Sequence, residues 1–171
     1  LKIENTGYLS IFVTSCDAET KMIKVLESLH FSAISTNHYR IHFNSKVQLK
    51  ELLSYLHSEI LELHCFEGCL HISDKPSLHE LCSLNIIYEH TFHEEVIEMI
   101  INAPLISSLQ PIVNFNTNEL YGYESLIQVK NQSILPSQLF EVAKKTELHY
   151  ILDKRARTEA IKARINRIPI G

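Results

Sequence analysis

Apolar residues change their spacing several times along this chain, and this change constrains the fold more than any other feature. Residues 8–14 place β-branched and aromatic side chains in partial alternation, which predicts a strand. Four apolar residues then recur at the spacing of one helix face: Met22, Val25, Leu26 and Leu29. Both spacings recur further along the chain, and such a mixture predicts an α/β fold of the mixed α+β kind.

The same patterns divide the chain into two predicted domains, residues 1–103 and residues 104–171. The other elements predicted before Pro104 are a hairpin of residues 33–36 and 39–43, a helix from Ser45 to Ile60, a strand over 69–73, and helices over 77–89 and 92–102. Ser45 and Gln48 have the spacing of a capping box. We expect this first part to be a small α+β domain of unknown role. A sensory or regulatory role, and the formation of a homodimer, are left open.

The second part has a different element order, in which two strands come first and two helices follow. The predicted strands are residues 109–115 and 120–127, and the predicted helices are residues 136–145 and 148–166. The polar run of residues 116–118 predicts a turn, so the two strands are expected to form a hairpin.

Composition limits the partners and the compartment. The 171 residues carry a formal net charge of -4, which argues against a general nucleic-acid binder. No apolar stretch approaches the length of a membrane span, and no signal peptide is visible at the start. We therefore expect a soluble, cytoplasmic chain with no membrane partner.

Histidines and cysteines cluster in one short segment, where zinc ligation is one interpretation. The cluster contains His64, Cys65, Cys69 and His71. Imidazole and thiolate are the ligands that zinc prefers, but no second Cys/His pair follows at a zinc-finger spacing. If residues 69–73 form a strand, Cys69 and His71 share one face, whereas Cys65 lies across a glycine turn. We interpret the cluster as buried small cysteines and surface histidines.

An ordered set of segments in residues 109–158 resembles the opening of an EAL domain. The segments are Gln-Pro-Ile-Val from Gln110, Tyr-Gly-Tyr-Glu-Ser-Leu-Ile from Tyr121, Leu-Pro-Ser-Gln-Leu-Phe from Leu135, and Leu-Asp-Lys-Arg-Ala-Arg from Leu152. The Glu-Ala-Leu signature of that family stands here as Glu124-Ser125-Leu126. EAL domains are bacterial cyclic-di-GMP phosphodiesterases built on a modified (β/α)8 barrel, so the resemblance implies that fold and that ligand.

The resemblance also implies roles for particular residues. Glu124 would be a ligand of a catalytic Mg²⁺ or Mn²⁺, which agrees with the preference of hard cations for carboxylate oxygen. Leu126 would contribute to the ligand pocket, and Gln110 would lie near the bound nucleotide. Active members commonly have an arginine that contacts a phosphate where this chain has Gln128. A neutral amide does not replace the bidentate, charge-assisted contact of a guanidinium.

The resemblance covers only the first part of an EAL domain. A (β/α)8 barrel takes about 250 residues, and the later family motifs that complete the metal and water site are absent from the sequence. We therefore interpret the chain as a fragment of a cyclic-di-GMP signalling protein that is inactive by itself. The alternative is a degenerate EAL protein that binds cyclic-di-GMP or another protein without catalysis.

Simpler interpretations stand beside these roles. Glu124 is also consistent with a solvated or lysine-paired glutamate on a strand, and Gln110 and Leu126 are consistent with ordinary strand packing. Basic residues in the last predicted helix raise nucleic-acid binding as an alternative: Lys154, Arg155, Arg157, Lys162, Arg164 and Arg167. No aromatic stacking platform accompanies them, so we favour a solvated helix face.

Overall fold

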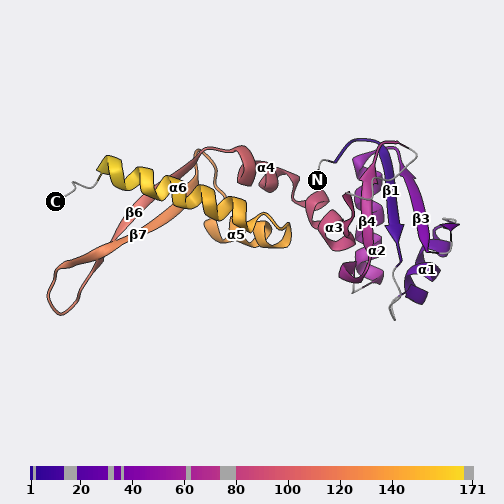
Figure 1. Cartoon of the computed structure of the whole chain (residues 1–171), viewed down its shortest axis with the longest axis horizontal. Coiled ribbons are helices and arrows are strands. Elements are labelled where there is room, and N and C mark those ends of the chain that lie inside the picture. The colour runs from indigo at the N-terminus through magenta and orange to yellow at the C-terminus, as the bar shows by residue number, and fades with distance from the viewer. Residues whose placement is uncertain are drawn as a thin grey trace. The chain divides into compact units, whose positions relative to one another are not determined.

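The computed structural model describes residues 1, 3–13, 19–30, 33–35, 37–60, 63–73 and 80–167. The chain divides into two compact units, Leu1–Phe92 and His93–Gly171, and each has its own hydrophobic core. Both units combine helices with an antiparallel sheet, so the predicted mixed α+β fold is confirmed (Figure 1). The described strands form one five-stranded and one two-stranded sheet, and they close no barrel.

The division falls earlier in the chain than the predicted boundary between residues 103 and 104. Helix α4 (Glu94–Asn102) was expected to end the first domain. Its buried residues Ile97 and Ile100 instead belong to the core of the second unit, together with Leu105 of the strand that follows. Helix α4 therefore belongs to the second unit by its packing.

The first unit is an antiparallel sheet with helices between its strands. Its elements are β1 (Gly7–Phe12), α1 (Glu19–Ser28), β2 (Ala33–Ser35), β3 (His38–Phe43), α2 (Lys46–Glu59), the 3-10 turn η1 (Leu63–Cys65), β4 (Glu67–His71), β5 (Cys82–Ser83) and α3 (Leu84–Phe92). The strand order is β2-β3-β1-β4-β5. The predicted hairpin is present as β2 and β3, which pair antiparallel.

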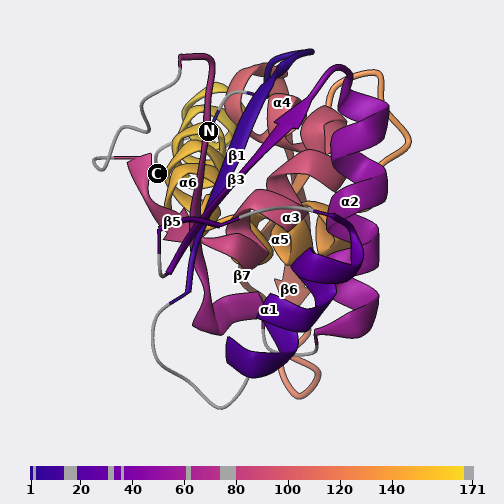
Figure 2. The ribbon, with the colours of Figure 1, turned by 90° about the vertical axis from the view of Figure 1, so that its right-hand side faces the viewer.

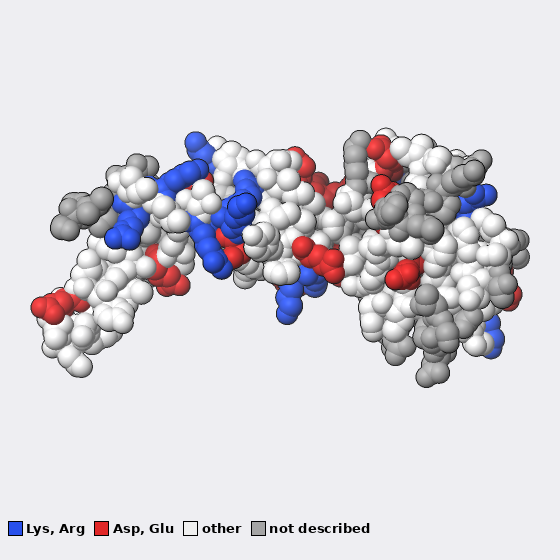
Figure 3. Space-filling model, viewed as in Figure 1, with Lys and Arg blue, Asp and Glu red and all other residues white. Residues whose placement is uncertain are grey.

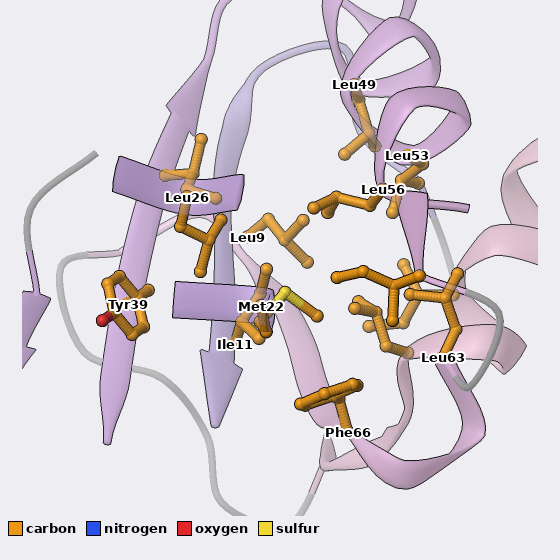
Figure 4. Packing of buried hydrophobic residues seen from close by; sticks show 14 of the residues in the cluster. Leu9, Ile11, Met22, Leu26, Tyr39, Leu49, Leu53, Leu56, Leu63 and Phe66 are labelled. Carbon is orange, nitrogen blue, oxygen red and sulfur yellow. The ribbon is translucent and has the colours of Figure 1, made fainter. Parts of the chain in front are cut away.

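Alternation along the strands gives this sheet two chemically different faces. Leu9 and Ile11 of β1 are fully buried in a core that also contains Met22 of α1 and Leu53 of α2 (Figure 4). Figure 2 shows α1 and α2 to one side of β1 and β3. Tyr8, Ser10 and Phe12 of β1 point to the opposite face, as the two-residue period of a strand requires.

Two local predictions in the first unit are corrected in detail. The Ser45 hydroxyl caps α2 by accepting from the backbone N–H of Gln48 at 3.2 Å, but the Gln48 side chain accepts from Asn44 rather than from Ser45. In place of a helix over 77–89, residues 82–83 form β5 and the helix runs from Leu84 to Phe92. Residues 82–83 form a strand and not a helix because they pair with β4 at the edge of the sheet. Residues 74–79 lie outside the described part.

The second unit has the predicted order of two strands and two helices after α4. These elements are β6 (Leu105–Val113), β7 (Leu120–Val129), α5 (Pro136–Lys145) and α6 (His149–Arg167). Strand β6 begins earlier than residue 109, because Leu105 and Ser107 already alternate into the core. Helix α6 runs along the β6–β7 hairpin and packs against it (Figure 1).

Candidate functional site

The candidate site lies on the β6–β7 hairpin, whose turn fixes the strand register. Asn118 has a φ of 56°, a left-handed conformation that asparagine tolerates well. Its backbone N–H donates to the carbonyl oxygen of Asn114 at 2.8 Å, and the Asn114 side chain accepts from the N–H of Asn116 at 2.9 Å. The turn expected at residues 116–118 is thus present.

The register brings the expected site residues together. Gln110 of β6 lies directly opposite Glu124 of β7, and Leu126 and Gln128 follow Glu124 at two-residue intervals. Directly opposed residues in an antiparallel pair, and alternate residues along a strand, point to the same face. Gln110, Glu124, Leu126 and Gln128 therefore share one face of the hairpin, which we call the Glu124 face.

The opposite face of the hairpin carries the packing of this unit. Leu105, Ile127 and Val129 are buried there in the core of the second unit. Ser107, which lies opposite Ile127, and Ser125, which lies opposite Leu109, are diagonal neighbours, and their hydroxyl oxygens are 2.6 Å apart on this side. Because the core uses this side, the Glu124 face is the side of the hairpin that the core does not cover.

The side chains of the Glu124 face are open to solvent. Gln110, Glu124 and Gln128 are exposed, and Leu126 is 39% exposed. Within the described residues, Glu124 takes part in no hydrogen bond or ion pair, so the lysine-paired interpretation finds no support there. The carboxylate is therefore accessible to a cation or another ligand.

The Glu124 face supplies one metal ligand and not a complete metal centre. Glu124 is the one carboxylate among the residues that β6 and β7 pair on this face. Across the described part of the chain, no group of three His, Cys, Asp or Glu side chains is arranged to hold a metal ion. A Mg²⁺ or Mn²⁺ at Glu124 would thus need further oxygen ligands from elsewhere.

The histidine–cysteine segment has other contacts. Cys69 and His71 do share one face of β4, as expected for a strand, and they lie opposite Ser10 and Tyr8 of β1. The Nε2 atom of His71 is 2.8 Å from the Ser10 hydroxyl, and its Nδ1 atom is 2.5 Å from the carbonyl oxygen of Ser73. Cys69 is buried, and burial raises the pKa of its thiol to about 11.

Lysines and arginines gather along α6 (Figure 3). Several of them are engaged within the second unit. Arg157 pairs with Asp153 at 2.6 Å, the spacing expected from the sequence, and Lys162 pairs with Glu159 at 2.7 Å. Arg155 donates to three backbone carbonyl oxygens at the end of α4: those of Met99, Ile100 and Ala103. The Arg167 side chain lies outside the described part.

Two surface hollows of the second unit lie beside α6. One, of about 500 Å³, is lined by Tyr123 and Ser125 of β7 and by Arg164 of α6. Another, of about 480 Å³, lies between Leu105 and residues of α6 that include Tyr150. All of these strand residues belong to the packed side of the hairpin, so neither hollow includes an expected site residue.

Two groups differ from what the sequence predicts: Arg155 is not on a solvated helix face, and no role was predicted for Ser10. Arg155 holds the end of α4, and Ser10 of β1 lies between two histidines, His38 and His71. The signal for Ser10 and His38 was the alternation in β1 and β3, which places polar and aromatic residues on one face. The alternation shows that Ser10 and His38 share a face only when β1 and β3 are aligned in register.

Comparisons with protein-family models, with curated proteins and with solved structures find no match to this chain. Among the described helices, none combines the length and the apolar character needed to cross a membrane.

Proposed function

We propose that the second unit is the opening part of an EAL barrel, and that the complete protein hydrolyses cyclic-di-GMP to linear pGpG with Mg²⁺ or Mn²⁺. The resemblance of residues 109–158 motivates the proposal. The observation that carries it is the direct opposition of Gln110 and Glu124 on a face that lies opposite the core formed with the described helices of this unit. Two separate segments of the resemblance thereby meet at one place.

The packing of the hairpin supports a barrel wall. In a (β/α)8 barrel the helices form an outer ring, and the other face of each strand points to the barrel interior. Helix α6 packs on one side of the hairpin, so the Glu124 face would become the interior. The apolar side chains on that face are 39% to 44% exposed: Ile106, Ile112 and Leu126. Further barrel strands would bury them.

In this proposal, each residue of the Glu124 face has a limited task. Glu124 contributes one carboxylate ligand, and Gln110 and Leu126 contribute an amide and an apolar contact to the nucleotide. A bound divalent cation supplies water activation and neutralises charge on the phosphate. Because one carboxylate does not complete such a centre, the 171 residues alone are proposed to be inactive, and the remaining ligands are proposed to come from further barrel strands.

The first test is the coding sequence after Gly171. A reading frame that continues into further strands and acidic motifs supports the proposal, and a stop codon at that point contradicts the phosphodiesterase.

The second test is an assay of the product of the whole reading frame, in which pGpG formation is measured with Mn²⁺. The Glu124→Gln variant should abolish turnover because an amide replaces the metal-binding carboxylate. Glu119→Gln is the matched control: it makes the same change at the exposed hairpin turn, where the backbone carbonyl oxygen of Glu119 accepts from Asn114. Undiminished turnover in Glu124→Gln would contradict the assignment.

Gln128 favours a second function, a non-catalytic cyclic-di-GMP-binding or protein-interaction regulator. Gln128 is exposed on the Glu124 face, opposite Ile106. Active EAL domains commonly have an arginine at this position that contacts a phosphate, whereas Gln128 offers a neutral amide. Titration calorimetry of the complete protein with cyclic-di-GMP, with and without Mn²⁺, distinguishes the two functions. Binding without pGpG formation indicates the regulator, and the absence of any binding indicates a protein-interaction role.

A further inference from the structure

The first unit contains a chain of hydrogen bonds that crosses three strands. The Nε2 atom of His38 in β3 is 3.0 Å from the hydroxyl oxygen of Ser10 in β1. The same oxygen is 2.8 Å from Nε2 of His71 in β4, and Nδ1 of His71 is 2.5 Å from the carbonyl oxygen of Ser73. Ser10 itself is fully buried. The two histidines are 33 residues apart in the sequence, and they meet only because β1 lies between β3 and β4.

The partners determine where each proton lies. A carbonyl oxygen only accepts, so Nδ1 of His71 must carry a hydrogen. In neutral His71 the Nε2 atom is then a bare acceptor, and the Ser10 hydroxyl donates to it. The Ser10 oxygen accepts in turn from Nε2–H of His38. The chain therefore runs in one direction when both imidazoles are neutral, from His38 through Ser10 and His71 to Ser73.

Two ring nitrogens of this series of hydrogen bonds can accept a further proton: Nε2 of His71 and Nδ1 of His38. On Nε2 of His71, it would turn the acceptor of Ser10 into a donor, and the hydroxyl of a fully buried serine would lose its acceptor. On Nδ1 of His38, it would place a cation beside Arg40. The pKa of His38 is lowered first by burial, then by the charge of Arg40 and by that of His71 when His71 is protonated. Protonation of His71 therefore removes the acceptor of the Ser10 hydroxyl, and protonation of His38 adds a cation beside Arg40.

We propose that the His38–Ser10–His71 chain is a proton-operated latch that joins β3, β1 and the end of β4 when both imidazoles are neutral, and releases the bond between Ser10 and His71 on protonation. The proposal concerns the first unit alone and is independent of any EAL function. Protonation would change the position of His71 and of the backbone at Ser73, whose carbonyl oxygen is hydrogen-bonded to His71.

The surroundings of the latch hold the neutral rings in place. The His38 ring stacks on Phe12, with ring centroids 4.4 Å apart and planes 8° apart, and the His71 ring stacks on Tyr8 at 5.5 Å and 18°. Among the described residues, the titratable and charged groups that β1, β3 and β4 place on the same face, or that lie near its edge, are Tyr8, Arg40, His42, Glu67, Cys69, Glu80 and Cys82. Arg40 lies over the Tyr8 ring, so fixed positive charge is already present beside the latch.

The test is a pH titration of the whole 171-residue chain by NMR, from pH 8 to pH 5, with the imidazole nitrogens observed directly. At pH 8 the expected tautomers are Nδ1–H for His71 and Nε2–H for His38. On acidification, the backbone amide signals of Ser10, His71 and Ser73 should shift with the same midpoint as the imidazole signals. The reversed tautomer of His71 at pH 8, or amide signals that do not follow the imidazoles, would overturn the proposal.

Three variants complete the design. His71→Gln retains an acceptor for the Ser10 hydroxyl but does not titrate, so the coupled shift at Ser10 should vanish while the fold remains. Ser10→Ala removes the shared hydroxyl, so the two histidines should titrate separately. His42→Gln is the matched control, because His42 is exposed on the same face and takes no part in the chain. Loss of the coupled shift in His42→Gln as well would contradict the latch.

Discussion

Gln110 lies directly opposite Glu124 across the β6–β7 hairpin. The turn that joins the two strands is held by the hydrogen bonds of Asn114, so the opposition of this pair follows from local structure. The pairing places an amide and a carboxylate side by side on an exposed face, and Leu126 and Gln128 extend that face along β7. Gln128 lies four residues beyond Glu124, about 13 Å along the strand, so only a ligand that extends along β7 would contact all four side chains.

Under the proposed function, replacement of Gln128 by arginine should strengthen the binding of cyclic-di-GMP to the complete protein by at least tenfold. A charge-assisted hydrogen bond contributes about 1.5–3 kcal/mol, and about 1.4 kcal/mol corresponds to a factor of ten in affinity. The measurement is titration calorimetry of Gln128→Arg against the unchanged protein. Ile106→Arg is the matched control, because it adds the same charge to the same face on the opposite strand. An equal gain in both variants would indicate general electrostatic attraction and contradict a specific phosphate contact at residue 128.

Replacement of Arg155 by alanine should lower the free energy of unfolding of the second unit by about 2–3 kcal/mol. The guanidinium donates to the carbonyl oxygens of Met99, Ile100 and Ala103, which lie at the C-terminal end of α4, where a positive charge is favourable. The measurement is urea unfolding of the full chain. The control is Arg157→Ala in the same helix, whose pair with Asp153 is solvent-exposed and should contribute less than about 0.5 kcal/mol. Equal losses in the two variants would contradict this role of Arg155.

The sequence was most informative where one side of an element is buried. The helical spacing of Met22 and Leu26 predicts that both face a core, and both are fully buried (Figure 4). The hairpin of the second unit was predicted from a polar turn between two β-rich segments, and its register then brings Gln110 and Glu124 together. These features depend on local spacing, which a single sequence contains.

Features that depend on packing between distant segments were predicted less well. Residues 82–83 were assigned to a helix but form β5, because the edge of β4 offers unpaired backbone groups that local propensity does not represent. The predicted domain boundary at Pro104 followed the helix-breaking residue. The observed division precedes α4, because Ile97 and Ile100 pack with β6 and β7. The meeting of His38 with His71 depends likewise on strand order, which spacing alone does not determine.

Cys69 should react with iodoacetamide far more slowly than Cys82 in the native chain. Burial, the largest cause, together with the charges of Glu80 and Cys82, raises the pKa of the Cys69 thiol from 9.0 to about 11. The thiolate is the reactive form, so a rise of this size lowers its fraction roughly a hundredfold near neutral pH. Cys69 is also fully buried, whereas Cys82 is partly exposed.

Peptide mapping by mass spectrometry after brief labelling at pH 8 measures both sites in one sample. Labelling in urea is the control, since both thiols should then react at similar rates. Rapid native labelling of Cys69 would show that β4 opens readily beside Ser10, and it would contradict the packed sheet face described for this unit.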